Sequence, residues 1–135
     1  MSLLRIFDLV GSAMSAQATR LNVTASNLAN AETVASSPQD AYHAREPVFS
    51  TILDQRDPAA GGVRVLGVTQ STADVTKRYE PGHPLADADG YVYGSNVNPI
   101  EEMVNMLSAS RSYQNGIEVL NTSKELLLRT LNLGR

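Results

Sequence analysis

The residues that could carry chemistry in this chain are few and scattered. His43 and His83 are the only histidines, and neither has a second histidine or a cysteine three or four residues away, which is the spacing of a metal site on a helix. The segment "DADG" (87–90) resembles part of a calcium-binding loop, but Leu85 stands where the first aspartate is required and Asn96 where the final glutamate is required. We therefore expect neither a metal site nor a cofactor.

No nucleophile is placed for catalysis either. The chain has no cysteine, which removes disulfides and thiolate chemistry. The glycines of "GGVRVLG" (61–67) are not followed by the Lys-Ser/Thr of a phosphate-binding loop, and no serine lies in a G-x-S-x-G turn. We expect no catalytic residues and no enzymatic activity.

Composition restricts the partners. The formal net charge is −3 and the sequence pI is about 5.3, so the basic surface of a nucleic-acid-binding protein is missing. No apolar run reaches the 18 residues that a membrane span requires, so we expect no membrane insertion. The N-terminus superficially resembles a secretory signal, but Asp8 interrupts its apolar stretch, and we expect no cleaved signal peptide.

Residues 1–31 are predicted to form one amphipathic helix, because a heptad pattern runs through them. Its a and d positions are Phe7, Val10, Met14, Gln17, Leu21, Thr24, Leu28 and Ala31. Arg5, Asp8 and Arg20 are the only charged residues, and most of the remaining polar surface is serine, threonine and asparagine. A water-facing helix normally carries charge, and this composition is intrinsically helix-poor. We therefore expect the uncharged faces to be buried against other chains and the termini to become ordered only on assembly.

Residues 99–133 are predicted to form a longer helix with clear end signals. Asn98 is a suitable N-cap, Pro99 takes the first helical position, and Glu101 is placed to close a capping box onto Asn98. Gly134 is a candidate C-terminal cap. The expected seam positions are Met103, Met106, Ser110, Tyr113, Ile117, Leu120, Lys124, Leu127 and Leu131. Asn115-Gly116 is normally a turn signal, but the seam continues in phase through it, so we expect an unbroken helix.

The segment between the helices has β character. "EPVFSTIL" (46–53), "VRVLGV" (63–68), "ADVTKRYE" (73–80) and "GYVYG" (90–94) are strand candidates, and turns are expected at 58–62, 81–82 and 89–90. The predicted fold class is α+β. Two long terminal helices are expected to pack as a coiled-coil-like pair, parallel or antiparallel, with a small β-rich insert between them in the chain. The expected division is 1–33, 34–98 and 99–135.

Both ends of the chain carry motifs of a known family. "SAQATRLNVTASNLANAET" (15–33) resembles the N-terminal signature of the bacterial flagellar axial proteins, which include rod and hook subunits. The run from 79 to 134, with "PGHP", "GYVY", "NVNPIEEM" and "ASRSYQN", is similar to the proximal rod members of that family in particular. The segment 34–50 departs from the family pattern: it keeps a tyrosine and a basic residue, but it lacks the glycine of the family's Gly-Pro-Tyr stretch and the adjacent basic cluster.

The resemblance implies contacts between subunits. Together with the seam positions, it assigns assembly roles to Phe7, Met14, Leu21, Asn22, Asn27, Leu28, Asn30, Met103, Asn105, Met106, Arg111, Tyr113, Gln114, Leu120 and Leu127. It assigns helix capping to Asn98, Pro99 and Glu101.

The resemblance also implies a function, which is that of a structural subunit polymerising helically in the periplasmic rod of the flagellar basal body. The implied partners are copies of itself, other proximal and distal rod proteins, the rod-to-ring junction protein and the flagellar type III export apparatus. An adaptor or export-linked factor that docks one flagellar partner through its terminal helices is the alternative. A cell-wall enzyme is a third class, and the chain lacks the residues for it.

Overall fold

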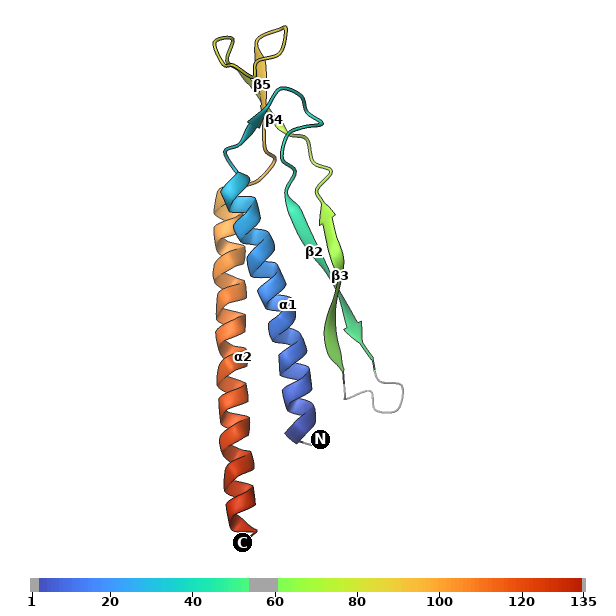
Figure 1. The fold of residues 1–135 in the computed structure, drawn as a ribbon, viewed down its shortest axis with the longest axis vertical. Helices are drawn as coiled ribbons and strands as arrows, with labels where there is room; N and C mark the ends of the chain where they lie inside the picture. The colour runs from blue at the N-terminus through green and yellow to red at the C-terminus, as the bar shows by residue number, and fades with distance from the viewer. Residues whose placement is uncertain (1–2, 54–60, 135) are drawn as a thin grey trace.

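Two long antiparallel helices form the body of the molecule. The computed structural model describes residues 3–53 and 61–134. Helix α1 (Leu3–Asn30) runs towards one end of the molecule, and helix α2 (Pro99–Leu133) returns beside it and continues past the start of α1 (Figure 1). The α+β class with long terminal helices is thereby confirmed. Of the two orientations left open by the sequence, the structure has the antiparallel one.

The insert consists of two small antiparallel sheets. A three-stranded sheet, ordered β1-β5-β4, contains β1 (Val34–Ala35), β4 (Thr76–Tyr79) and β5 (Tyr91–Gly94). A hairpin pairs β2 (Arg45–Ile52) with β3 (Gly62–Gln70). The four predicted strands are found where expected, and the expected turn at 89–90 is confirmed, with Gly90 at a φ of 82°. The turn expected at 58–62 lies mainly outside the described residues.

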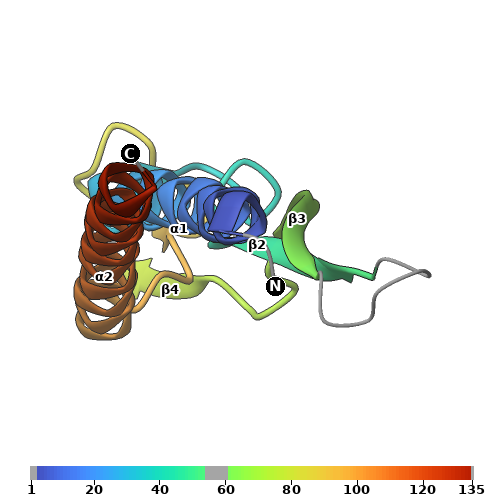
Figure 2. The ribbon, with the colours of Figure 1, turned by 90° about the horizontal axis from the view of Figure 1, so that it is seen from below.

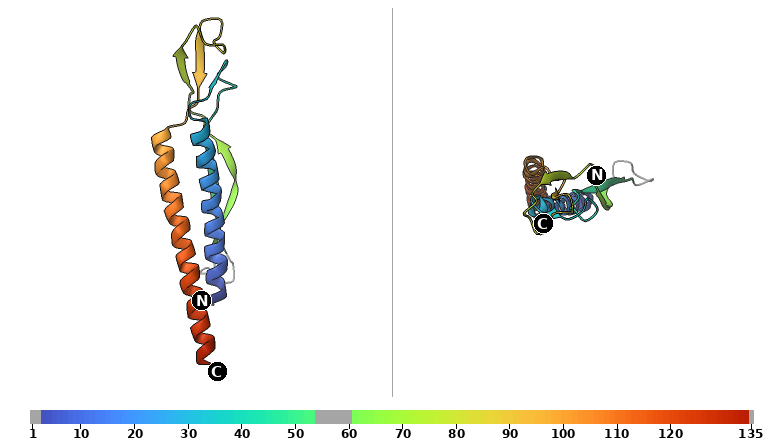
Figure 3. Two further views of the ribbon diagram at one scale, coloured as in Figure 1. Left: turned by 60° about the vertical axis from the view of Figure 1, so that its left-hand side comes forward. Right: turned by 90° about the horizontal axis from the view of Figure 1, so that it is seen from above.

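The two sheets have different positions relative to the helices. The three-stranded sheet lies beyond the end where α1 stops and α2 begins, whereas the hairpin turns back and runs beside α1 (Figures 1 and 3). Seen from below, α1 lies between α2 and the hairpin (Figure 2). Helix α1 contacts α2, β2 and β3. The expectation that other chains cover the uncharged faces of this helix therefore needs correction, because the hairpin of the same chain covers part of them.

The seam on α2 that faces α1 differs by one position from the predicted one. Ala109 is fully buried, and Ser123, fourteen residues (123 − 109) further on, is also buried. Midway between them, a Cβ added to Gly116 would lie 2.7 Å from Met14 Cγ, so the two helix backbones approach closely there. Small residues that repeat every seven positions therefore form half of the seam.

The other half of the predicted seam is partly buried, as expected. Met106, Tyr113, Leu120 and Leu127 are half-buried. The predicted positions that alternate with them are Met103, Ser110, Ile117, Lys124 and Leu131. Of these, Met103 is 59% exposed and Leu131 is 61% exposed. The sequence pattern failed here because it followed the large apolar residues Met103, Ile117 and Leu131, whereas the close approach of the helices at Gly116 requires a small one.

The start of α2 is capped largely as predicted. Asn98 Oδ1 accepts hydrogen bonds from the N–H groups of Ile100 and Glu101, and Pro99 takes the first helical position. Among the described residues, no hydrogen bond runs from the Asn98 N–H to the Glu101 carboxylate, so the reciprocal half of the expected capping box is missing. The helix is continuous through Asn115-Gly116 as expected, and it ends before Gly134, whose φ of −92° is not left-handed.

Candidate functional site

The last turns of α1 contain a fully buried asparagine. Asn27 is 1% exposed, and its Oδ1 accepts hydrogen bonds from the Arg45 N–H at 2.9 Å and from the Tyr42 hydroxyl at 3.0 Å. Its Nδ2 donates to the Arg45 carbonyl at 2.9 Å. Arg45 is the first residue of β2, so the amide binds the open edge of this strand as another strand would. The expected contact of Asn27 with other subunits is therefore corrected, because its side chain is enclosed within its own chain.

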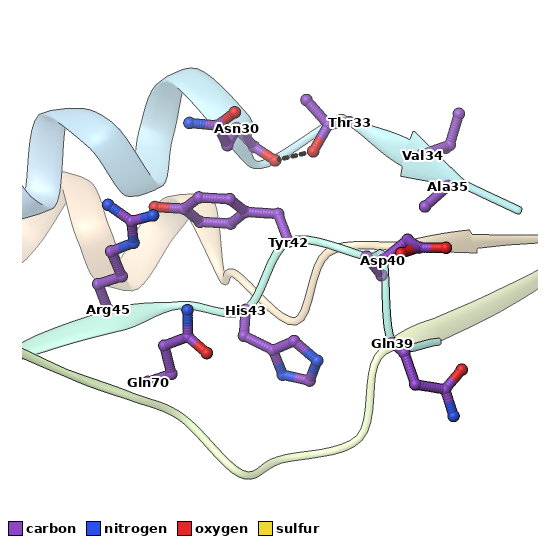
Figure 4. Close-up of a pocket in the computed structure, with 11 residues that line it drawn as sticks. Asn30, Thr33, Val34, Ala35, Gln39, Asp40, Tyr42, His43, Arg45 and Gln70 are labelled. Carbon is purple, nitrogen blue, oxygen red and sulfur yellow. Dashed lines mark hydrogen bonds between the residues drawn. The ribbon is translucent and has the colours of Figure 1, made fainter. Parts of the chain in front are cut away.

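The polar residues next to Asn27 are also engaged within the chain. Ser26 Oγ lies 3.2 Å from the Tyr42 hydroxyl, and Asn30 Nδ2 donates to the Ser26 carbonyl at 2.8 Å. A polar hollow adjoins this cluster, with Asn30 and Thr33 on one side and the segment from Tyr42 to Arg45 on the other (Figure 4). Asn30 thus bonds back to a carbonyl within α1, and Ser26 extends the hydrogen-bond network around the Tyr42 hydroxyl.

A second asparagine, in the connection between β5 and α2, binds the chain close to Arg45. Asn96, two residues before the cap of α2, accepts the Ala44 N–H on its Oδ1 at 2.6 Å and donates from its Nδ2 to the Ala73 carbonyl at 2.8 Å. Its backbone N–H donates to the Tyr42 carbonyl at 3.4 Å. Beside it, Ser95 Oγ donates to the Ala31 carbonyl at 2.6 Å. The end of α1 and the connection that leads into α2 are therefore both bonded to residues 42–45, which we name the neck segment.

Further polar bonds join the elements along α1. Arg20 Nη2 donates to Asn105 Oδ1 at 3.0 Å, which links α1 to the first turns of α2. Ser12 Oγ accepts the Val63 N–H at 3.1 Å, which links α1 to β3. Asn105, one of the residues assigned to assembly, therefore has a partner within the chain.

The other residues assigned to assembly fall into two groups. Those that are half-buried between the elements are Phe7, Met14, Leu21, Leu28, Met106, Tyr113, Leu120 and Leu127. Those exposed on the outer surface are Asn22, Met103, Arg111 and Gln114. Only the second group is fully available to another chain.

Helix α2 exposes many more large apolar side chains than the sequence pattern suggested. At about 100° per residue, they form two ridges that flank the seam facing α1. The first ridge consists of Met103, Leu107, Ile117, Leu128 and Leu131, and the second of Val104, Val119, Leu126 and Leu133. Such an extent of exposed apolar surface is typical of a protein–protein interface.

Asp87 organises the turn that leads into β5. Its Oδ1 accepts the N–H groups of Asp89 and Tyr91 at 3.0 and 2.8 Å, and its Oδ2 accepts the Tyr93 hydroxyl at 3.0 Å. The bond from the Tyr91 N–H is the largest of the contributions that lower the pKa of Asp87, and the bond to Asp87 is the largest of those that raise the pKa of Tyr93. The Lys77 ammonium lies over the Tyr91 ring, 4.0 Å from its centroid. These contacts explain "DADG" as a turn whose carboxylate binds backbone.

The sequence did not identify Asn96, Ser95 or Tyr42 as structural residues. An asparagine that binds backbone far away in the chain leaves no periodic signal, so only the position of Asn96 just before a capped helix could have suggested it. Among the described residues, no three His, Cys, Asp or Glu side chains gather so as to hold a metal ion, and no helix is long and apolar enough to span a membrane.

Comparison with known proteins gives full-length relatives. A family model described as "Flagella basal body rod protein" matches residues 8–34, and one described as "Flagellar basal body rod FlgEFG protein C-terminal" matches residues 88–133. The flagellar basal-body rod protein FlgC of Salmonella typhimurium is 53% identical over 135 residues and covers 100% of both chains. The proteins of the same name from Yersinia enterocolitica and from Buchnera aphidicola subsp. Schizaphis graminum are 52% and 42% identical, with 100% and 99% of both chains covered.

Proposed function

This chain belongs to the family of flagellar basal-body rod proteins, and from this premise we propose that it is a structural subunit of the proximal rod. In this proposal the subunits polymerise helically into the drive shaft, with the helix pair forming part of the export-channel wall and the β insert facing outward. The chain performs no catalysis in this role. Its partners are further copies of itself and the other proximal and distal rod proteins.

The observation that carries the proposal is the pair of apolar ridges on α2. In the isolated chain these side chains face water, and burial contributes roughly 25 cal/mol for each Å² of apolar surface removed from it. An adaptor that docks one partner needs one apolar stripe, whereas a subunit in a tube wall needs a neighbour on each side. Ridges on both sides of the α1-facing seam support the second arrangement.

The proposed location follows from the same role. A rod subunit acts in the basal body, and we propose that this chain reaches the periplasmic part of the rod through the flagellar type III export apparatus, without a cleaved signal peptide. Contact with the rod-to-ring junction protein is part of this proposal.

The test is a deletion strain complemented with variants and scored by motility and by electron microscopy of isolated basal bodies. Leu107→Glu places a carboxylate on the first ridge, where burial in an interface would be costly. Thr72→Glu is the control, since Thr72 is exposed in the loop between β3 and β4 and lies outside both ridges. We expect Leu107→Glu to abolish rods and Thr72→Glu to support them. Intact rods in the deletion strain would refute the function, and full motility from Leu107→Glu would refute the role of the ridge.

A further inference from the structure

The neck segment passes between two asparagines, one near the end of α1 and one in the segment that leads from β5 into α2. Asn27 on α1 binds both backbone groups of Arg45, and Asn96 before α2 binds the N–H of the preceding residue, Ala44. We propose that Asn27 and Asn96 are positioning residues that form one joint and fix the orientation of the β2–β3 hairpin on the helix pair. This inference is drawn from the contacts within one chain and does not depend on the function proposed above.

The backbone groups of the neck segment are hydrogen-bonded on both of its edges. In an antiparallel pair, the N–H and C=O of one residue point to the same side of the strand. Those of Arg45 point to Asn27, while the Ala44 carbonyl accepts the Ser71 N–H at 2.7 Å on the side of the continuing β3 chain. The neck segment is thus bound on both of its edges at successive residues. A rotation of the hairpin about the neck would break several of these bonds together.

Hydrogen bonds serve this purpose better than apolar contacts. They depend steeply on angle, whereas burial of apolar surface is non-directional and permits sliding. A two-stranded hairpin is marginally stable by itself, and β2 and β3 expose Phe49, Leu66 and Val68. Along α1, Ser12 Oγ also accepts the Val63 N–H of the hairpin. The several directional bonds gathered at the neck lead us to place the control of hairpin orientation there.

A distance measurement between the hairpin and α2 tests the joint directly. The chain has no cysteine, so Arg64→Cys on β3 and Ser108→Cys on α2, both exposed positions, can be spin-labelled as a unique pair. We expect one narrow distance distribution by pulsed electron paramagnetic resonance for the otherwise unchanged chain. A broad distribution in that chain would overturn the proposal.

Two variants and one control then assign the effect to the asparagines. Asn27→Asp keeps the shape but places an oxygen opposite the Arg45 carbonyl in place of the donor Nδ2, and Asn96→Ala removes the second half of the joint. Asn22→Asp makes the same chemical change at an exposed position of α1. We expect loss of the narrow peak in Asn27→Asp and Asn96→Ala, with helical circular dichroism retained, and no loss in Asn22→Asp.

Three other results would refute the joint. A narrow peak that persists in both neck variants would show that other contacts orient the hairpin. Loss of helical circular dichroism in both variants would assign the two asparagines to overall stability instead. An equal loss of the peak in Asn22→Asp would show that any added charge on α1 has the same effect.

Discussion

The close approach of the helices at Gly116 makes a paired alanine experiment informative. Alanine in place of glycine inside a helix is worth roughly 1 kcal/mol of stability through helix propensity. Gly11, on α1, has open space around it, since a Cβ there would meet nothing within 4 Å. We therefore expect Gly11→Ala to raise the free energy of unfolding of the isolated chain by about 1 kcal/mol.

At Gly116 the same substitution meets the other helix. The added Cβ would lie 2.7 Å from Met14 Cγ, 3.2 Å from Met14 Sδ and 3.6 Å from Val10 Cγ1. Favourable contacts between carbon atoms lie at about 3.5 to 4.0 Å, so Met14 must move by roughly 1 Å. Overpacking of this kind costs about 1 to 3 kcal/mol, which equals or exceeds the propensity gain. We expect Gly116→Ala to lower stability by roughly 0 to 2 kcal/mol and to lie about 1 to 3 kcal/mol below Gly11→Ala.

Urea unfolding followed by circular dichroism measures both variants, and Met14→Ala supplies the diagnostic background. With the Met14 side chain shortened, Gly116→Ala should be stabilising, because the obstructing atoms are gone. If Gly116→Ala stabilises the unaltered chain as much as Gly11→Ala does, the two helices are not in close contact at this position. The reasoning about the small-residue seam would then be refuted.

Three further predictions concern other parts of the chain. Asn98→Ala should cost about 1 kcal/mol in urea unfolding because it removes the N-cap of α2, and Asn98→Ser should recover most of it; equal losses in both would contradict the cap. The lowered pKa of Asp87 means that the stability it contributes is present above the ordinary carboxyl range and is lost as the pH falls through its folded-state value. The difference in melting temperature between wild type and Asp87→Asn should therefore shrink on acidification, and a difference that stays constant with pH would contradict it. Trypsin should cut the isolated chain at exposed Arg129 before Arg20, which is half-buried and bonded to Asn105; early cleavage at Arg20 would instead support termini that order only on assembly.

Local signals in the sequence predicted the elements well. Asn98-Pro99 places the start of α2, Asp89-Gly90 places a turn, and the alternation in "VRVLGV" places β3. Each of these depends on residues close together in the chain, where propensity and capping act directly. Residue spacing could not determine the direction in which the second helix packs on the first, because a parallel and an antiparallel partner would both bury the same apolar stripe.

Relations between distant segments were predicted less well, and Asn27 shows why. Its type suggested a polar contact without a charge, which is what the structure contains, but the partner is Arg45 of the same chain. Nothing in the sequence near Asn27 or Arg45 specifies this pairing. The turn that brings the neck segment back to the end of α1 is a property of the whole insert.

The small residues of α2 face α1, and many of its large apolar residues face outward. The free chain and the assembly therefore draw stability from different side chains of this helix. The seam facing α1 uses Ala109, Gly116 and Ser123, while Met103, Leu107 and Leu131 remain exposed. Large side chains contribute most on burial, so their exposure leaves this gain unused in the free chain and available on contact with neighbours. Substitutions in the two places should then act on different steps. Gly116→Ala should change the unfolding free energy of the free chain, whereas Leu107→Glu should leave it nearly unchanged and prevent assembly. If Leu107→Glu lowered the unfolding free energy of the free chain and Gly116→Ala prevented assembly, the exposed ridge, and not the small-residue seam, would hold the helix pair together.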